Sequence, residues 1–466
     1  MKIKLNNINI DKKNPFKEDI LERKESVEIL TQLISETQDS LVLAIDSLWG
    51  TGKTTFVKMW QMHLENKGFS TLYFNAWEND FNDDALIALI GEIEIAIDSF
   101  ETENSKLDKI QYNFEKIKRA ASVLIKNSIP IALKYASAGV LDYDDLTEKA
   151  IGEITEKIAK NEINKYEESK HILTEFKEHL ENFAKEITDS EKPIVFFIDE
   201  LDRCRPTYAL QVLEKAKHFF NVENIVFVLA IDKNQIGNSI KGIYGLDMDV
   251  DGYLRRFIDL NYHLPEPPKG AFVEALFKRF NFNKYFEERT NQSSNFRNDK
   301  EHFVSIFSEL FSILNFSLRI QEQCFTQISL VFKTTPVSFK LYPILLAVLI
   351  SIKNYNLDLY KRYINGNIDS NEIMTELFSS KEGKEFLDSH YGNVIEAYLI
   401  YYDSTEVKEQ LIEKYRDIKD NQDINKDTYR KAEKIISIIN DLDFAVAHNV
   451  KDYVVKKIEI MDRFQN

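Results

Sequence analysis

The sequence predicts an α/β fold with a mostly parallel sheet flanked by helices, a helical insertion and an all-α C-terminal region. Short apolar runs of strand length alternate with stretches of helical periodicity through the first 265 residues. One such strand leads into a glycine-containing loop and a helix, and another ends in two acidic residues. Beyond residue 270 the pattern is helical, with no clear strand alternation. We therefore expect a core over residues 1–265 with an insertion at about 101–192, a helical lid over 266–335, and a C-terminal helical domain over 336–466.

Length and composition restrict the function classes. A chain of 466 residues suggests about three domains. The formal net charge of -16 argues against a protein that binds nucleic acid nonspecifically over its whole surface. It does not exclude a local basic channel. Cys204 and Cys324 form no pairing framework, and the N-terminus has no signal-peptide pattern, so we expect a reducing, cytoplasmic location. The eight histidines lack ligand spacing, so we expect no His/Cys metal site.

The first expected element is a helix within the segment Pro15–Ser35. Its residues Ile20, Val27, Leu30 and Leu33 fall at helical spacing. Proline just before such a stretch is compatible with a helix start. A packing helix explains the pattern better than a direct functional site does.

The chain is organised around the segment Leu41–Phe56, which reads LVLAIDSLWGTGKTTF. It begins with an apolar run of strand length, continues through a glycine-containing loop, and leads into a helical pattern that closes on Gly68. A strand, a glycine-rich loop and a helix in this order are the structural context of a phosphate-binding P-loop. The alternative is an ordinary glycine-containing turn before a helix, which the flanking strand and helix disfavour.

The chemistry of phosphate binding explains the residue types in this loop. A triphosphate needs a concave row of backbone N–H donors, glycine lets the backbone come close, and the helix N-terminus adds partial positive charge. Lys53 is expected to reach the β- and γ-phosphates, and the Thr54 hydroxyl to ligate Mg²⁺. Ser47 departs from the general pattern, which begins with Gly, so this position must avoid a conformation that only glycine adopts. The expected nucleotide-binding residues of the loop are Ser47, Leu48, Trp49, Gly50, Thr51, Gly52, Lys53, Thr54 and Thr55.

A second strand and a long helical insertion follow. Thr71–Asn75 is predicted to be a buried strand, and Asp84–Phe100 an apolar helix. Trp77, just beyond the strand, is expected to anchor the packing, which is favoured over a position beside a functional site. Residues 101–192 are rich in lysine and glutamate and carry long helical patterns. One apolar stripe of this insertion comprises Ile163, Tyr166, Ile172, Leu173, Phe176, Leu180, Phe183 and Ile187.

The segment Ala120–Leu141 is the candidate for a membrane span. It contains Lys126, Asn127, Pro130 and Lys134. Charges at that depth are costly, and no uninterrupted apolar run of the needed length is present. A buried or interfacial helical region is therefore favoured over a membrane span, and we expect no association with a membrane.

Acidic residues follow two later strands. Pro193–Cys204, PIVFFIDELDRC, contains a buried strand that ends at Asp199 and Glu200. In an open parallel sheet ligands bind outside the carboxyl ends of the strands, where an Asp can hold Mg²⁺ and a neighbouring Glu can orient or deprotonate the attacking water. The alternative is a strand with an acidic loop. A further strand, Asn224–Ile231, ends at Asp232, which is expected to sense the γ-phosphate or position water.

Five motifs carry a family resemblance. WGTGKTT, FNAWEND, FFIDELDRC, VFVLAIDKNQI and YLRRFIDL, in this order, make the region from Phe16 to Leu330 resemble the KAP P-loop NTPases, on the STAND and AAA+ side of the P-loop superfamily. The resemblance implies Mg²⁺-dependent ATP binding and hydrolysis. The resemblance also implies that this chain is a soluble member of the family and that it acts with partner proteins. Similar members often occur in bacterial mobile or phage-defence loci. Ser47 departs from the family's usual Gly.

The resemblance also implies roles for three arginines. Arg255 and Arg256 lie on an expected helix before a short strand at Phe257–Tyr262, in a region where related AAA+ proteins offer an arginine to a neighbour's nucleotide. Arg319 lies on the helix expected at Phe316–Leu330, where a lid arginine contacts the nucleotide of its own chain. The alternative for the first pair is ion pairing with nearby acids such as Asp249 and Asp251.

Two hypotheses from different classes follow, together with a third. The first is an Mg²⁺-dependent ATPase that self-associates. The second is a nucleotide-gated switch or scaffold with little turnover, which Ser47 and the long helical tail favour. The third is a membrane-tethered adaptor, which rests on Ala120–Leu141. Nothing in the sequence identifies the base of the nucleotide, and nucleic acid as a partner stays open.

Overall fold

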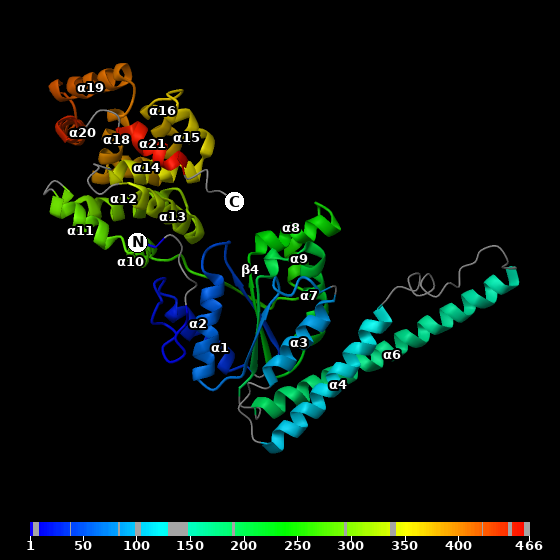
Figure 1. Ribbon diagram of the computed structural model, residues 1–466. Coiled ribbons are helices and arrows are strands. Elements are labelled where there is room, and N and C mark those ends of the chain that lie inside the picture. The colour runs from blue at the N-terminus through cyan, green and yellow to red at the C-terminus, as the bar shows by residue number, and fades with distance from the viewer. Residues whose placement is uncertain are drawn as a thin grey trace. The chain divides into compact units, whose positions relative to one another are not determined.

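The protein is described by a computed structural model that divides it into two compact units. One unit comprises residues 9–19 and 23–265, and the other residues 1–8, 20–22 and 266–466. Figure 1 shows the elements of both. The structure describes residues 1–2, 9–37, 39–82, 84–97, 104–128, 148–188, 192–292, 296–335, 342–421, 423–445 and 450–460.

A five-stranded parallel sheet forms the centre of the first unit. Its strands are β1 (Leu41–Asp46), β2 (Thr71–Asn75), β3 (Ile194–Asp199), β4 (Ile225–Ile231) and β5 (Leu260–His263). The order across the sheet is β2-β3-β4-β1-β5, so β4 lies between the strand that leads into the P-loop and the strand that ends in the acid pair. The register aligns Asp46 with Ile231 and Asp199 with Ala230. The carboxyl ends of β1, β3 and β4 therefore meet at one edge, as the sequence predicts.

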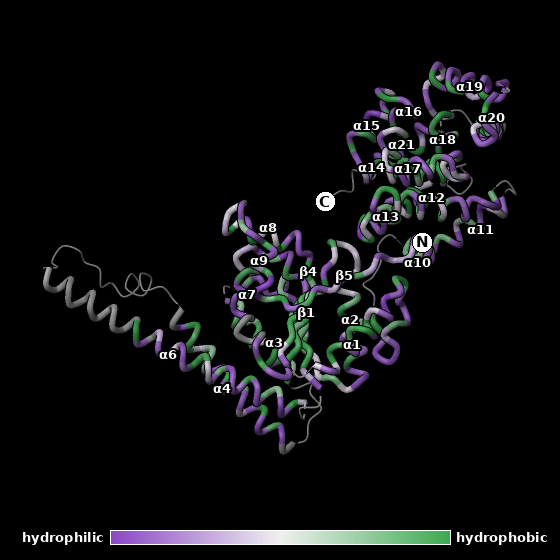
Figure 2. The backbone as a smooth tube through the Cα atoms, turned by 180° about the vertical axis from the view of Figure 1, so that it is seen from behind, coloured by the Kyte–Doolittle hydropathy of each residue, from purple (hydrophilic) through white to green (hydrophobic). Residues whose placement is uncertain are grey.

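Helices cover both faces of this sheet. The described helical elements of the unit are α1 (Lys24–Ser35), α2 (Lys53–Asn66), α3 (Ala85–Ile97), α4 (Asn104–Ser128), α6 (Glu148–Thr188), the 3-10 turn η1 (Leu201–Arg203), α7 (Pro206–Phe220), α8 (Lys233–Tyr244) and α9 (Val250–Leu254). Alternate strand residues face opposite sides. Phe196 and Leu229 belong to an apolar cluster that includes residues of α3 and α7, whereas Phe197 and Val228 pack with α1 and α2 around the fully buried Trp60. Burial on both faces explains the continuous apolar strands seen in Figure 2.

The predicted helical insertion lies between β2 and β3. Helices α4 and α6 pack side by side and fold back along each other (Figure 1). The apolar stripe of α6 is buried only over its second half, at Phe176, Leu180, Phe183 and Ile187, whereas Ile163 and Tyr166 are exposed.

The membrane candidate Ala120–Leu141 lies partly outside the described residues. Its first part belongs to α4, where Ala120 and Ala121 are buried, and residues 129–141 are not described. Among the helices that the structure describes, none is both long and apolar enough to cross a membrane.

The second unit is helical over its described residues. Its helices are α10 (Ala271–Arg279), α11 (Asn283–Gln292), α12 (Asp299–Ile313), α13 (Leu318–Thr334), α14 (Pro343–Tyr355), α15 (Leu357–Ile364), α16 (Ser370–Leu377), α17 (Lys381–Leu387), α18 (His390–Tyr401), α19 (Thr405–Asp420), α20 (Lys426–Ala445) and α21 (Val450–Ile460). One apolar cluster includes residues from α10 to α21, and every residue of α14 from Pro343 to Lys353 is buried. The division into a lid over 266–335 and a domain over 336–466 stays a prediction.

Three expected boundaries are corrected. The helix in Pro15–Ser35 begins only at Lys24, after a turn that contains Ile20, and it is a packing helix with Val27 and Leu30 buried. The strand expected at 257–262 is β5, at 260–263, because Phe257 and Ile258 are buried ahead of the strand and its pairing with β1 begins at Leu260. Helix α9 ends before the two arginines that were expected on it.

Candidate functional site

The P-loop connects β1 to α2 and uses glycine where its backbone requires it. Gly50 and Gly52 have φ values of 77° and 93°, in the left-handed region that side chains with a Cβ rarely adopt. Ser47 does not have a positive φ. Its N–H donates to the Ile231 carbonyl at 3.1 Å, and its hydroxyl lies 2.6 Å from that of Thr51. Serine at the first position is therefore compatible with the loop.

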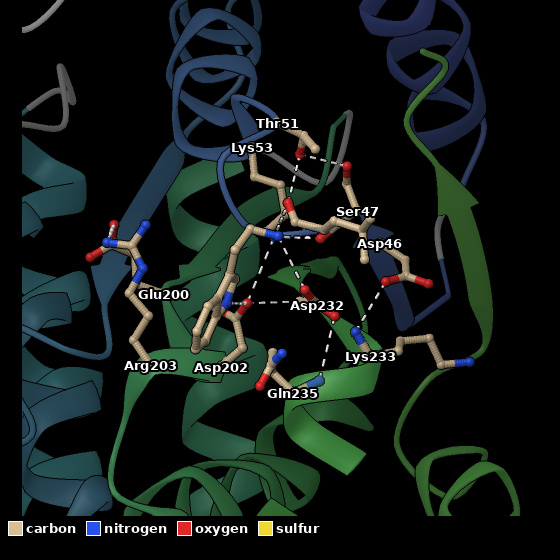
Figure 3. A network of polar contacts seen from close by, with 12 residues as sticks. Asp46, Ser47, Thr51, Lys53, Glu200, Asp202, Arg203, Asp232, Lys233 and Gln235 are labelled. Carbon is tan, nitrogen blue, oxygen red and sulfur yellow. Dashed lines mark hydrogen bonds and ion pairs between the residues drawn. The ribbon is translucent and has the colours of Figure 1, made fainter. Parts of the chain in front are cut away.

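Lys53 is the first residue of α2, and its ammonium group is at the centre of the loop. The side chain is 9% exposed. The ammonium group donates to the carbonyls of Ser47 and Leu48, and it lies 3.7 Å from a carboxylate oxygen of Asp202. Figure 3 shows these contacts converging on the Lys53 nitrogen. The loop thus holds its cation next to the helix N-terminus, where a phosphate would gain from both positive charges.

Asp202 connects the loop to the ends of two other strands, and the sequence analysis missed it. It lies in η1, just after β3, with a buried side chain. Its Oδ2 atom accepts hydrogen bonds from the Trp49 indole nitrogen at 2.6 Å and from the Asp232 backbone N–H at 3.0 Å (Figure 3). A buried carboxylate that joins three segments fixes their relative positions. The signal available in the sequence was a third acid within IDELD, three residues after Asp199.

Asp199 ends β3 and meets Thr54 across the sheet edge. Its carboxylate is 1% exposed and accepts hydrogen bonds from the Tyr73 hydroxyl at 3.0 Å and the Glu200 N–H at 2.8 Å. The Thr54 side chain also hydrogen-bonds to it. Burial raises the pKa of Asp199, and these hydrogen bonds oppose the rise. A hydroxyl and a carboxylate in contact are oxygen donors of the kind Mg²⁺ prefers, so the two expected metal ligands lie together.

Glu200 follows with a backbone in the left-handed region, at φ 60°. Its Oε1 atom lies 2.7 Å from the Arg203 guanidinium, and the Asn75 side chain at the end of β2 also hydrogen-bonds to it. Burial raises the pKa of Glu200, and Arg203 acts in the opposite direction. Left-handed backbone at a residue with a side chain is uncommon and recurs at functional sites. Trp77 was expected as a packing anchor, but it is exposed and lies beside Arg203.

Asp232 lies at the end of β4 and caps helix α8. Its side chain accepts from the N–H groups of Asn234 and Gln235, at 3.1 and 3.4 Å. Its other oxygen accepts from the Trp49 N–H at 3.1 Å. Asp232 therefore belongs to the network around the P-loop, as Figure 3 shows, and its role as a γ-phosphate sensor stays a prediction.

The three expected arginines lie on the surfaces of their units. Arg255 and Arg256 are exposed at the end of α9, and neither forms an ion pair within the described part of the chain. The acids considered as their partners are engaged otherwise: Asp249 caps α9, and Asp251 pairs with Lys233 at 3.4 Å. Arg319 is exposed on α13, in the second unit.

Comparisons with known proteins found a family match and similar proteins. The KAP family P-loop domain matches residues 23–365. An uncharacterised protein of Methanocaldococcus jannaschii is 27% identical over 177 residues, which represent 34% of this chain and 88% of that protein. The solved structure of the Aeropyrum pernix ORC2 protein, in ADPNP–ADP complexes, covers 94% of this chain and 95% of its own with 11% identity, at a TM-score of 0.33.

Proposed function

Because this chain belongs to the KAP family of P-loop NTPases, we propose that it binds ATP with Mg²⁺ and hydrolyses the terminal phosphoanhydride bond. The choice of ATP over GTP comes from the family resemblance. The observation that carries the proposal is that the Lys53 ammonium group lies 3.7 Å from Asp202 while Thr54 hydrogen-bonds to Asp199, at the sheet edge where β1, β3 and β4 end. A phosphate cradle beside a buried carboxylate is the arrangement that positions a metal-bound triphosphate.

Each residue of the site would have a distinct part in this reaction. The backbone N–H groups of the loop and the Lys53 ammonium would bind and orient the phosphates. Thr54 and Asp199 would hold Mg²⁺, which neutralises charge on the transferring phosphoryl group. Glu200 would orient the attacking water and accept its proton. Such a site acts through positioning and electrostatic stabilisation.

The proposal is tested by titrating the full chain with ATP and measuring phosphate release in Mg²⁺ and in excess chelator. Asp199→Asn is expected to raise the Mg²⁺ concentration for half-maximal release by about tenfold or more, because a neutral amide is a weaker metal ligand than a carboxylate. The matched control is Asp247→Asn, which changes an exposed residue. An absence of ATP binding would overturn the function, and an unchanged Mg²⁺ requirement would overturn the role of Asp199.

A nucleotide-gated switch with little turnover is the second candidate function. The ion pair between Glu200 and Arg203 favours it, because an engaged carboxylate is a poorer base for water. Tight ATP binding without phosphate release, even with partner proteins and nucleic acid added, would support the switch over the hydrolase. Release that rises with added partner would support a hydrolase that acts with that partner.

Self-association is part of the same proposal. Arg255 and Arg256 are exposed and without an ion pair among the described residues, and an arginine fork suits the phosphate oxygens of a neighbouring site. We expect light scattering to detect a larger species with a slowly hydrolysed ATP analogue, and Arg255→Ala or Arg256→Ala to lower turnover by about tenfold or more. Turnover per chain that is independent of protein concentration, in a protein that stays monomeric, would contradict an arginine acting between copies. Arg319 would be tested separately, as a contact within one chain.

A further inference from the structure

The side chain of Glu200 is held by a residue of its own turn. Glu200 immediately precedes η1, and the Arg203 N–H donates to the Glu200 carbonyl at 3.1 Å. This tight turn brings the two side chains to the same side, where Arg203 Nη1 lies 2.7 Å from Glu200 Oε1. The Glu200 side chain is 13% exposed, so water competes weakly for its carboxylate. The ion pair is therefore short and shielded on the carboxylate side, whereas the Arg203 side chain is 37% exposed.

Trp77 also lies near the Arg203 guanidinium. The guanidinium carbon is 6.0 Å from the centroid of the Trp77 ring, within the range of a cation–π interaction. Trp77 follows β2 directly, and its loop is fixed to the segment after η1 by Arg205. The Arg205 Nε and backbone N–H donate to the two Asp80 carboxylate oxygens, at 2.9 and 2.7 Å. Arg203 thus contacts both the Glu200 carboxylate and the Trp77 ring.

This arrangement keeps Glu200 apart from the phosphate-binding network. Figure 3 shows the Glu200–Arg203 pair to one side of the contacts that join Lys53, Asp202 and Asp232, with no contact drawn between the two groups. A general base must come within about 2.6–3.2 Å of its water with a free lone pair. The guanidinium engages the Oε1 atom of that carboxylate and so restrains where the side chain can reach.

We propose that Arg203 is a positioning residue that restrains Glu200, so that release of their ion pair limits hydrolysis, with Trp77 as the surface that holds the guanidinium in place. The inference rests on the proposed function, because it assigns a control to the same site. Arg203 contacts no residue assigned to phosphate or metal binding through a hydrogen bond or ion pair among the described residues. Its removal is therefore expected to change the catalytic step and leave nucleotide binding intact.

The test is steady-state hydrolysis by the full-length Arg203→Gln variant. We expect kcat to rise roughly five- to tenfold, with KM and ATP affinity changed less than about twofold, because a charge-assisted hydrogen bond on the base is lost. Arg203→Lys is expected to return kcat toward the wild-type value, since it keeps a cation. In a Glu200→Gln background, Arg203→Gln is expected to have no effect. The matched control is Arg430→Gln, which removes an exposed guanidinium from α20.

A second variant keeps the inference testable if Arg203→Gln unfolds. Trp77→Leu leaves both charges in place and removes only the ring, and it is expected to raise kcat in the same direction by a smaller factor. Unchanged or lower kcat in a folded variant that still binds ATP would overturn the restraint alone, as would a rise that persists in the Glu200→Gln background. Failure of the wild-type protein to bind ATP would overturn the proposed function together with this inference.

Discussion

Replacing Lys53 with alanine is expected to weaken ATP binding by about 100-fold, which corresponds to ~3 kcal/mol of binding free energy. The ammonium group is the charge at the centre of the loop, and it is 9% exposed, so solvent screens it little. Without it, the phosphates retain only the backbone N–H groups and the helix N-terminus. Isothermal titration of ATP into the wild type and the variant measures the difference.

The control for this variant is Lys67→Ala. Lys67 lies just past the other end of the same helix and is exposed, so its removal changes net charge equally without touching the loop. Asp202 keeps its hydrogen bonds from Trp49 and Asp232 when Lys53 is replaced, so the fold is expected to persist, as thermal unfolding would show. Equal ATP affinity of wild type and Lys53→Ala would refute a phosphate-binding role for this loop.

The Glu200→Gln substitution is expected to lower turnover by about 100-fold or more while ATP affinity changes less than about threefold. Glutamine retains a hydrogen-bond acceptor for Arg203 but cannot take a proton from water, and general-base catalysis contributes on the order of 10²–10⁴ in rate. Single-turnover phosphate release, measured with excess enzyme, separates this loss from any change in product release.

Glu78→Gln is the matched control, because Glu78 is an exposed carboxylate whose charge also acts on Glu200. It is expected to leave turnover within about twofold of the wild type. If Glu200→Gln retains full turnover while Lys53→Ala abolishes it, the hydrolase proposal survives and another residue activates the water.

The central sheet could be predicted from the sequence because its signals are local. Strands β1, β3 and β4 are apolar runs, and the segments that follow them are marked by glycine or by acids, as at Gly52 and Asp199. A strand that is buried on both faces of the sheet has apolar residues at successive positions, and not only at every second one. The contact between Thr54 and Asp199 then follows from the general rule that parallel strands present their carboxyl ends at one edge.

The contacts of individual acids could not be predicted, because they depend on residues far apart in the sequence. Asp202 reads as one more acid in a turn until Trp49 and Asp232 are placed around it by the order of the strands. The pairing of Glu200 with Arg203 depends on the left-handed backbone of Glu200, for which a non-glycine residue gives no sequence signal. The apolar periodicity of α6 likewise predicted a helix but not which part of it packs, and Ile163 is exposed.

The insertion between β2 and β3 has a consequence for folding. These two strands pair directly, although more than a hundred residues separate Asn75 from Ile194. The entropy of closing a loop grows only with the logarithm of its length, by about 0.6 kcal/mol for each doubling. Relative to a crossover of roughly 30 residues, the longer connection costs ~1 kcal/mol. That is less than the loss expected from truncating one buried leucine to alanine, about 3 kcal/mol, so strand pairing tolerates a helical hairpin of this size.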